Sequence, residues 1–332
     1  MQKTHFEIIG TCFFVMGLCS GAFCQQPQAP AEPPAQEQSV QKQADAQGAA
    51  VIGQIFNVPV PLGNYLFVKS TLMVFGNRWG AQPKETREWE DTIWEQLVLS
   101  FEAFRRNIQV SDQEIEEEID RSLKGEKVSF DWRKDKEAFA KWVKEKTNEP
   151  VELFQGQIRH ILQLQKLRDQ VRDSINPSVP EKEAYQQFLN ENNHLDLELV
   201  QFSDERQAQD FFRQAKRNKK FWEEQKAKNS KEFKHPGFVT LIFLADIWKI
   251  PQDALDRMLK LSAGTVYQPA PIYKGYAVFK VLGKRVAEES LFAKSRYGYH
   301  DKVALKKKYE GLNDWIRQLK QDANIKILKQ GG

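Results

Sequence analysis

Apolar side chains recur at the three-and-four spacing of amphipathic helices through residues 81–190. One stripe runs from Trp89 to Phe104, with Pro83 just before it. A second runs from Ile115 to Leu123, and it follows the capping-box sequence Ser111-Asp-Gln-Glu114 and ends at Gly125. Two further stripes use Phe139, Trp142 and Val143, and then Leu153, Phe154, Ile158, Ile161, Leu162, Leu164, Leu167 and Val171. The pattern predicts a helical domain over 81–190.

The flanking segments carry strand-like patterns. In residues 51–80, large apolar side chains alternate from Tyr65 to Phe75 between Gly63-Asn64 and Gly76-Asn77, which predicts a β-rich segment. Trp79 is expected to lie beside a strand that packs on the main body. Residues 191–286 predict a strand at 195–202, a helix at 205–216, a lysine-rich stretch, an apolar run at 238–244, a short helix at 251–261 and two closing strands.

Residues 287–332 predict a helix followed by a strand at 323–328. Six large apolar side chains share one face of that helix: Leu305, Tyr309, Leu312, Trp315, Ile316 and Leu319. Such a face needs a partner surface, because exposed apolar area is unfavourable in water. We therefore expect both ends of the chain to form one discontinuous body, with residues 191–286 inserted. The whole is predicted to be an α+β fold.

Residues 1–24 have the pattern of a secretory leader. Lys3 precedes an apolar run from Ile8 to Phe23, which is too short to span a bilayer comfortably, and Ala22 and Cys24 suit a cleavage site before Gln25. An uncleaved anchor, or lipid attachment at Cys19 or Cys24, is the alternative. Residues 25–50 are rich in Gln, Ala and Pro and predict a disordered linker. We expect a periplasmic or otherwise extracytoplasmic protein.

Composition excludes several kinds of site. All three cysteines lie in the leader, so the processed chain has no thiol and no disulfide. His160, His194, His235 and His300 are scattered without metal-ligand spacing, and no nucleotide-binding loop is evident, so no metal and no cofactor is expected. A nucleic-acid partner is not expected either, since 49 Lys and Arg are nearly balanced by 45 Asp and Glu. The lysine clusters at 216–234 and 302–308 predict solvated helix faces, and attraction to anionic lipid headgroups is the alternative.

The two closing strands resemble a known family. Gly264, Pro269, Gly275 and Tyr276, followed by the apolar strand Val278 to Leu282, are similar to the last hairpin of parvulin-type (PpiC) peptidyl-prolyl isomerases. Residues 90–190 resemble the amino-terminal helical domain of SurA-type chaperones and their PpiD and PrsA relatives. The sequences that carry this likeness are Asn107-Ile-Gln-Val, Ser111-Asp-Gln-Glu-Ile, Gln157-Ile-Arg-His-Ile-Leu-Gln-Leu-Gln-Lys-Leu and Ile175-Asn-Pro-Ser-Val-Pro-Glu. The opening strand and Asn-Gly turn of that family are not evident in residues 51–80.

The resemblance implies a parvulin-like module at 191–286 whose catalytic positions are substituted. Active members use a first His, a Met, a Phe and a second His. The corresponding positions here hold Leu199, Ile250, Ala254 and Ala277, respectively. The resemblance thus implies lost catalysis, and the alternative is that His194 or His235 has moved into the cleft. The candidates for a peptide-binding groove are Trp248, Ile250, Met258, Tyr276 and Phe279, with core packing as the competing interpretation for Met258 and Phe279.

Three functional hypotheses follow from the resemblance. The first is a chaperone that binds unfolded envelope or secreted polypeptides. The second is an active prolyl isomerase with a rearranged site. The third is a structural component of an envelope complex.

Overall fold

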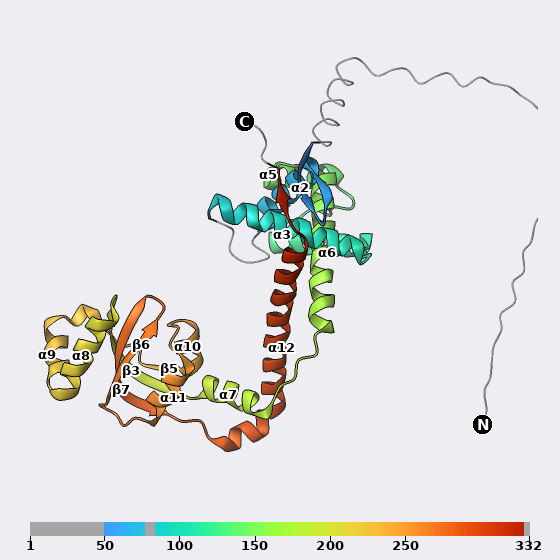
Figure 1. Ribbon diagram of the computed structural model, residues 1–332. Coiled ribbons are helices and arrows are strands. Elements are labelled where there is room, and N and C mark those ends of the chain that lie inside the picture. The colour runs from blue at the N-terminus through green and yellow to red at the C-terminus, as the bar shows by residue number, and fades with distance from the viewer. Residues whose placement is uncertain (1–49, 77–83, 329–332) are drawn as a thin grey trace, which may run out of the picture. The chain divides into compact units, whose positions relative to one another are not determined.

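The computed structural model describes residues 50–76 and 84–328 (Figure 1). All of these except Ala50 belong to one compact unit, Val51–Gly332. The predicted leader at 1–24, nearly all of the predicted linker at 25–50, and Asn77, Trp79 and Pro83 lie outside the described residues. Within the described ranges, no helix combines the length and the apolar character that crossing a membrane requires.

The described chain opens on a β-hairpin of β1 (Val51–Ile55) and β2 (Val58–Pro61). The two turn residues, Phe56 and Asn57, have φ angles of 53° and 63°, as a type I′ turn requires. An opening strand therefore exists, although the sequence pattern did not reveal one. The signal was missed because Phe-Asn stands where Asn-Gly usually marks this turn.

Residues 62–75 form a helix, and the strand predicted from Tyr65 to Phe75 is wrong. Helix α2 (Leu62–Phe75) begins directly after Pro61. Its buried side chains follow helical spacing: Tyr65, Val68, Thr71, Leu72 and Phe75. Both alternating sets of this segment are largely apolar, so period-two alternation could not discriminate between strand and helix. Packing against α3 (Thr86–Arg105) decides the outcome.

The predicted helices at 81–190 are present. Helices α4 (Asp112–Gly125), α5 (Lys136–Thr147) and α6 (Val151–Ser174) follow α3. The capping box of α4 is confirmed, because the Ser111 hydroxyl accepts from the Glu114 amide while the Glu114 carboxylate accepts from the Ser111 amide. The apolar stripes of α3 and α6 meet in one core, and those of α4, α5 and α6 meet in another. Helix α7 (Glu181–Asn192) comes next.

The last helix and strand return to the first elements of the chain, as the sequence predicts. Helix α12 (Glu289–Asp322) contacts α3 and α6, and Figure 1 shows it beside α6. Leu312 and Leu319 join the core of α2, α3 and α6, and Lys320 Nζ lies 3.0 Å from a carboxylate oxygen of Glu95. Strand β8 (Lys326–Ile327) pairs with β1, giving the order β2-β1-β8. Leu305 and Tyr309 depart from the prediction, because both are about half exposed.

Residues 194–285 form a second sheet with helices on both faces (Figure 1). Its strands are antiparallel in the order β4-β3-β7-β6, and β5 also pairs with β3. The strands are β3 (His194–Phe202), β4 (Phe233–Lys234), β5 (Phe238–Thr240), β6 (Val266–Ile272) and β7 (Gly275–Arg285). Helices α8 (Glu205–Arg217) and α9 (Phe221–Lys228) pack on one face, and α10 (Leu241–Asp246) and α11 (Gln252–Lys260) on the other.

Part of the lysine-rich stretch is tied to this sheet. The indole Nε1 of Trp222 donates to Glu198 Oε2 at 2.6 Å, and Lys226 forms an ion pair with the same carboxylate. Burial alone would raise the pKa of Glu198. The hydrogen bonds from Lys226 and Trp222 together outweigh burial, so the pKa of Glu198 is lowered. A buried carboxylate that accepts from both side chains therefore holds α9 against β3.

Candidate functional site

The four family positions of the module lie together in a closed apolar core. Leu199 is on β3, Ala277 on β7 and Ala254 on α11, while Ile250 precedes α11. All four side chains are buried in the cluster that these elements share. The positions that the resemblance assigns to catalysis thus hold packed aliphatic groups.

His194 and His235 make their hydrogen bonds near the start of β3, whereas Ala277 lies beside the end of that strand. His194 Nδ1 lies 2.9 Å from the Asn192 carbonyl oxygen, and His235 Nε2 lies 2.6 Å from Asp196 Oδ1. Ala277 pairs with Gln201, seven positions after His194 on the same strand. At the rise of an extended strand this separates His194 from the Gln201–Ala277 pair by roughly 23 Å.

The five proposed groove residues do not share one surface. Ile250, Met258 and Phe279 are buried in the core of the sheet face that carries α10 and α11. Tyr276 packs on the other face with α8 and α9, because successive residues of a strand point to opposite sides. Of the five, Trp248 lines an accessible pocket.

That pocket has a volume of about 290 Å³ and lies at the turn between β6 and β7. Its other lining residues are Gln201, Lys234, Ile247, Ile272, Tyr273 and Lys274. It therefore combines two lysines with aromatic and aliphatic surface.

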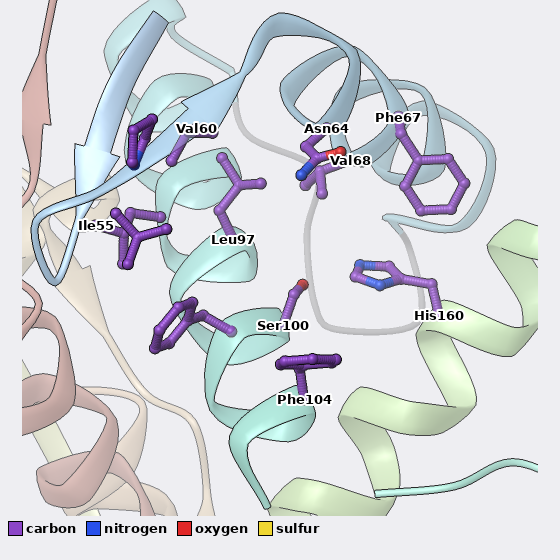
Figure 2. A pocket seen from close by; sticks show the side chains of 12 residues that line it. Ile55, Val60, Asn64, Phe67, Val68, Leu97, Ser100, Phe104 and His160 are labelled. Atoms are coloured by element: carbon purple, nitrogen blue, oxygen red, sulfur yellow. The ribbon is translucent and has the colours of Figure 1, made fainter. Parts of the chain in front are cut away.

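The hairpin, α2 to α6 and the end of α12 together form the helical body. A second pocket of about 290 Å³ lies in this body (Figure 2). Its apolar walls come from the hairpin, from α2 and from α3. The lining residues are Ile55, Val58, Pro59, Val60, Asn64, Phe67, Val68, Leu97, Ser100, Phe101, Phe104 and His160. No local sequence pattern predicts this pocket, because its lining comes from four separate segments, namely the hairpin, α2, α3 and, through His160, α6. Phe104 was expected on the buried stripe of α3, yet it is 81% exposed.

Local geometry explains how the hairpin and α3 form the walls. The ring of Phe56 at the hairpin turn stacks on Phe101 of α3, with ring centroids 5.1 Å apart. The amide of Phe56 also donates to the Ala323 carbonyl oxygen at 2.7 Å. The hairpin is therefore fixed to α3 and to the end of the chain. Phe104, one turn after Phe101, is left at the mouth of the pocket with its ring toward solvent.

The opposite wall carries a buried imidazole. His160 of α6 is 9% exposed, and its ring lies edge-on to Phe67 with centroids 5.4 Å apart. Its Nε2 atom makes no hydrogen bond to any part of the chain that the structure describes. Burial lowers the pKa of His160 to about 4, so the ring is neutral at neutral pH. The imidazole is thus a neutral, enclosed part of the apolar wall.

A chain of hydrogen bonds beside the pocket fixes α2 against α6. Gln157 Nε2 donates to Ser70 Oγ at 2.5 Å, and Ser70 Oγ donates to Glu149 Oε1 at 2.7 Å. Gln157 lies one turn before His160 on α6, and Ser70 lies one turn after Phe67 on α2. The wall formed by Phe67 and His160 is thereby held in place.

The chain is similar in fold to solved structures of PrsA and of SurA-like chaperones. No protein-family model and no curated protein matches the sequence. The peptidylprolyl isomerase PrsA from Bacillus anthracis has a TM-score of 0.41 and 16% identity, with 71% of this chain and 98% of that one covered. PrsA from Bacillus cereus has a TM-score of 0.39 and 14% identity, with 85% and 95% covered. A structure from the pair of SurA-like chaperones PEB4 and Cj1289 of Campylobacter jejuni has a TM-score of 0.37 and 14% identity, with 84% and 99% covered. At these identities the likeness concerns the fold and assigns no activity.

Proposed function

We propose that this protein is an extracytoplasmic chaperone that binds unfolded polypeptides through the pocket of its helical body. The observation that carries the proposal is the exposed Phe104 ring at the mouth of an apolar cavity of about 290 Å³. A large exposed aromatic beside a concave apolar surface is typical of a binding site rather than of a closed core.

The composition of the pocket suits clients of varied sequence. Most of its lining is aliphatic or aromatic, and van der Waals contacts with such groups do not require a particular partner. Asn64 and Ser100 add polar groups that can bond the backbone of an extended segment. The predicted leader at 1–24 supports a site of action outside the cytoplasm.

We further propose that the parvulin-like module has lost catalysis. Rotation about a prolyl amide has a barrier of about 20 kcal/mol. An isomerase must therefore bind the twisted amide more tightly than the planar one. The four substituted positions are packed in one apolar cluster, and none offers a hydrogen-bonding side chain for that purpose. They hold Leu199, Ile250, Ala254 and Ala277.

Two assays on one preparation test both parts of the proposal. The purified protein without residues 1–24 should slow the aggregation of an unfolded client. It should leave unchanged the slow phase of a proline-limited refolding reaction, which lasts tens of seconds without a catalyst. A client that aggregates at its unassisted rate would contradict the chaperone assignment. Acceleration of the slow phase at substoichiometric protein would contradict lost catalysis and favour a rearranged isomerase.

A further inference from the structure

We propose that the pocket beside Trp248 is a second, charge-selective site. Its ligand is an acidic side chain of an extended polypeptide, bound together with an apolar side chain next to it in the ligand's sequence. This inference goes beyond the proposed chaperone pocket, because it concerns different residues and a different chemistry.

The two lysines of the pocket are not neutralised by the protein. Lys234 Nζ donates to the amide oxygen of Gln201 at 3.2 Å, and Lys274 Nζ lies 5.7 Å from the centroid of the Tyr273 ring. Within residues 50–76 and 84–328, neither lysine forms an ion pair, although several exposed lysines do. The lining contains no carboxylate, and the nearby Asp246 is not part of it. The site is therefore a cationic surface that lacks its counter-charge.

Gln201 brings the two lysines to one place. Its amide nitrogen donates to the Lys274 carbonyl oxygen at 2.6 Å, while its amide oxygen accepts from Lys234. The Gln201 side chain on β3 thus forms hydrogen bonds with a residue of β4, Lys234, and with a residue of the turn between β6 and β7, Lys274. Both lysines line the same pocket, so a carboxylate bound there would be attracted by two positive charges.

The turn that presents Lys274 is fixed by a close backbone contact and by a hydrogen bond. Gly275 has a φ of 94°, and a Cβ built on it would lie 2.2 Å from the Phe202 carbonyl oxygen. The position therefore requires glycine, and the turn lies directly on the end of β3. The Tyr273 amide donates to the Trp248 carbonyl oxygen at 2.9 Å, which joins the turn to the segment after α10. A site held in this way loses little entropy on binding.

Apolar surface lies next to the cations. Tyr273 is 69% exposed and Ile247 is 60% exposed, and both line the pocket with the half-buried Trp248. A free phosphate would leave this surface unused, whereas a peptide with an acidic and an apolar residue side by side would cover both parts. Charge complementarity and the adjoining apolar area thus indicate a polypeptide ligand.

Fluorescence anisotropy on the full processed chain tests the proposal. The probe is a labelled, acetylated and amidated peptide with a central Leu-Glu-Leu, compared with the same peptide carrying Leu-Gln-Leu. The Glu peptide should bind more tightly than the Gln peptide, and more weakly as salt is added. The double variant K234Q/K274Q should weaken binding of the Glu peptide about tenfold and bring it to the level of the Gln peptide.

The matched control is the double variant K231Q/K260Q. It removes two exposed lysines of the same module that do not line the pocket, so binding of the Glu peptide should stay unchanged. The charge reversal K234E/K274E should instead favour a Leu-Lys-Leu peptide. The proposal is overturned if the wild-type protein does not bind the Glu peptide, if it binds the Glu and Gln peptides equally, or if the control variant weakens binding as much. It is also overturned if the two lysines are needed for binding to anionic lipid vesicles but not to the peptide.

Discussion

Gly53 of the first strand leaves the space into which the ring of Trp94 packs. A Cβ built on Gly53 would lie 2.4 Å from Cη2 of Trp94 and 2.6 Å from the carbonyl oxygen of Lys326. The close approach joins three parts of the chain, namely the opening hairpin, α3 and the closing strand.

Replacing this glycine should destabilise the body. We expect Gly53→Ala to lower the free energy of unfolding by about 1–3 kcal/mol, because the ring or the strand must move. Gly298→Ala is the matched control: nothing lies within 4 Å of a Cβ there, in the interior of α12, so it should stabilise by up to about 1 kcal/mol. Urea denaturation measures both, and equal effects would contradict the close packing.

The two ends of the chain should be energetically coupled through α12. Leu319 is buried in the core shared by α2, α3 and α6, so Leu319→Ala should lower the free energy of unfolding by about 2–5 kcal/mol. Leu305→Ala on the same helix serves as control, since that side chain is half exposed and should matter far less. If urea denaturation gives Leu319→Ala a loss as small as that of Leu305→Ala, the end of α12 does not belong to the body.

Stability should fall in mild acid because of His160. Its pKa is lowered from the ordinary 6.5 to about 4 in the folded protein, so the unfolded chain binds the proton first. The contribution is complete above pH 6.5 and is lost as the pH falls toward 4, by roughly 3 kcal/mol in all. Denaturation of His160→Gln across this window should show a smaller pH dependence than that of the wild type. An unchanged slope in His160→Gln would exclude this origin.

Restoring one imidazole should not restore an isomerase. Ala277 is fully buried among apolar groups, so Ala277→His should lower the free energy of unfolding by about 1–3 kcal/mol. No acceleration of proline-limited refolding is expected, because Leu199, Ile250 and Ala254 remain. Catalysis by the single variant would mean that the module's cleft is still organised for the reaction.

The sequence predicted those elements whose local signals agree. The capping box at Ser111, the stripes of α3 to α6 and the α-and-β order of the module all combine periodicity with clear end signals. The signals failed where they conflict. In α2 both faces are rich in apolar residues, and the Phe56-Asn57 turn lacks the glycine that usually marks a type I′ hairpin.

The sites were harder to foresee than the elements. Met258 and Phe279 could not be separated from core residues by type alone, and Tyr276 lies on the opposite face of the sheet from both. The pocket of the helical body depends on how hairpin, α2, α3 and α6 meet, which no local pattern records. Phe104 is an extreme case, since its spacing fits the buried stripe while its ring extends past the end of the core.

The central claim is that the pocket of the helical body binds unfolded clients, and the affinity of the Phe104→Asp variant for a labelled unfolded client tests it most directly. Because Phe104 is 81% exposed, the variant should fold normally, yet a charge at the mouth of the pocket should weaken binding about tenfold or more. Tyr297→Asp alters an equally exposed aromatic of α12 that does not line the pocket, so its affinity should match the wild type. Equal affinities of all three proteins would contradict the account.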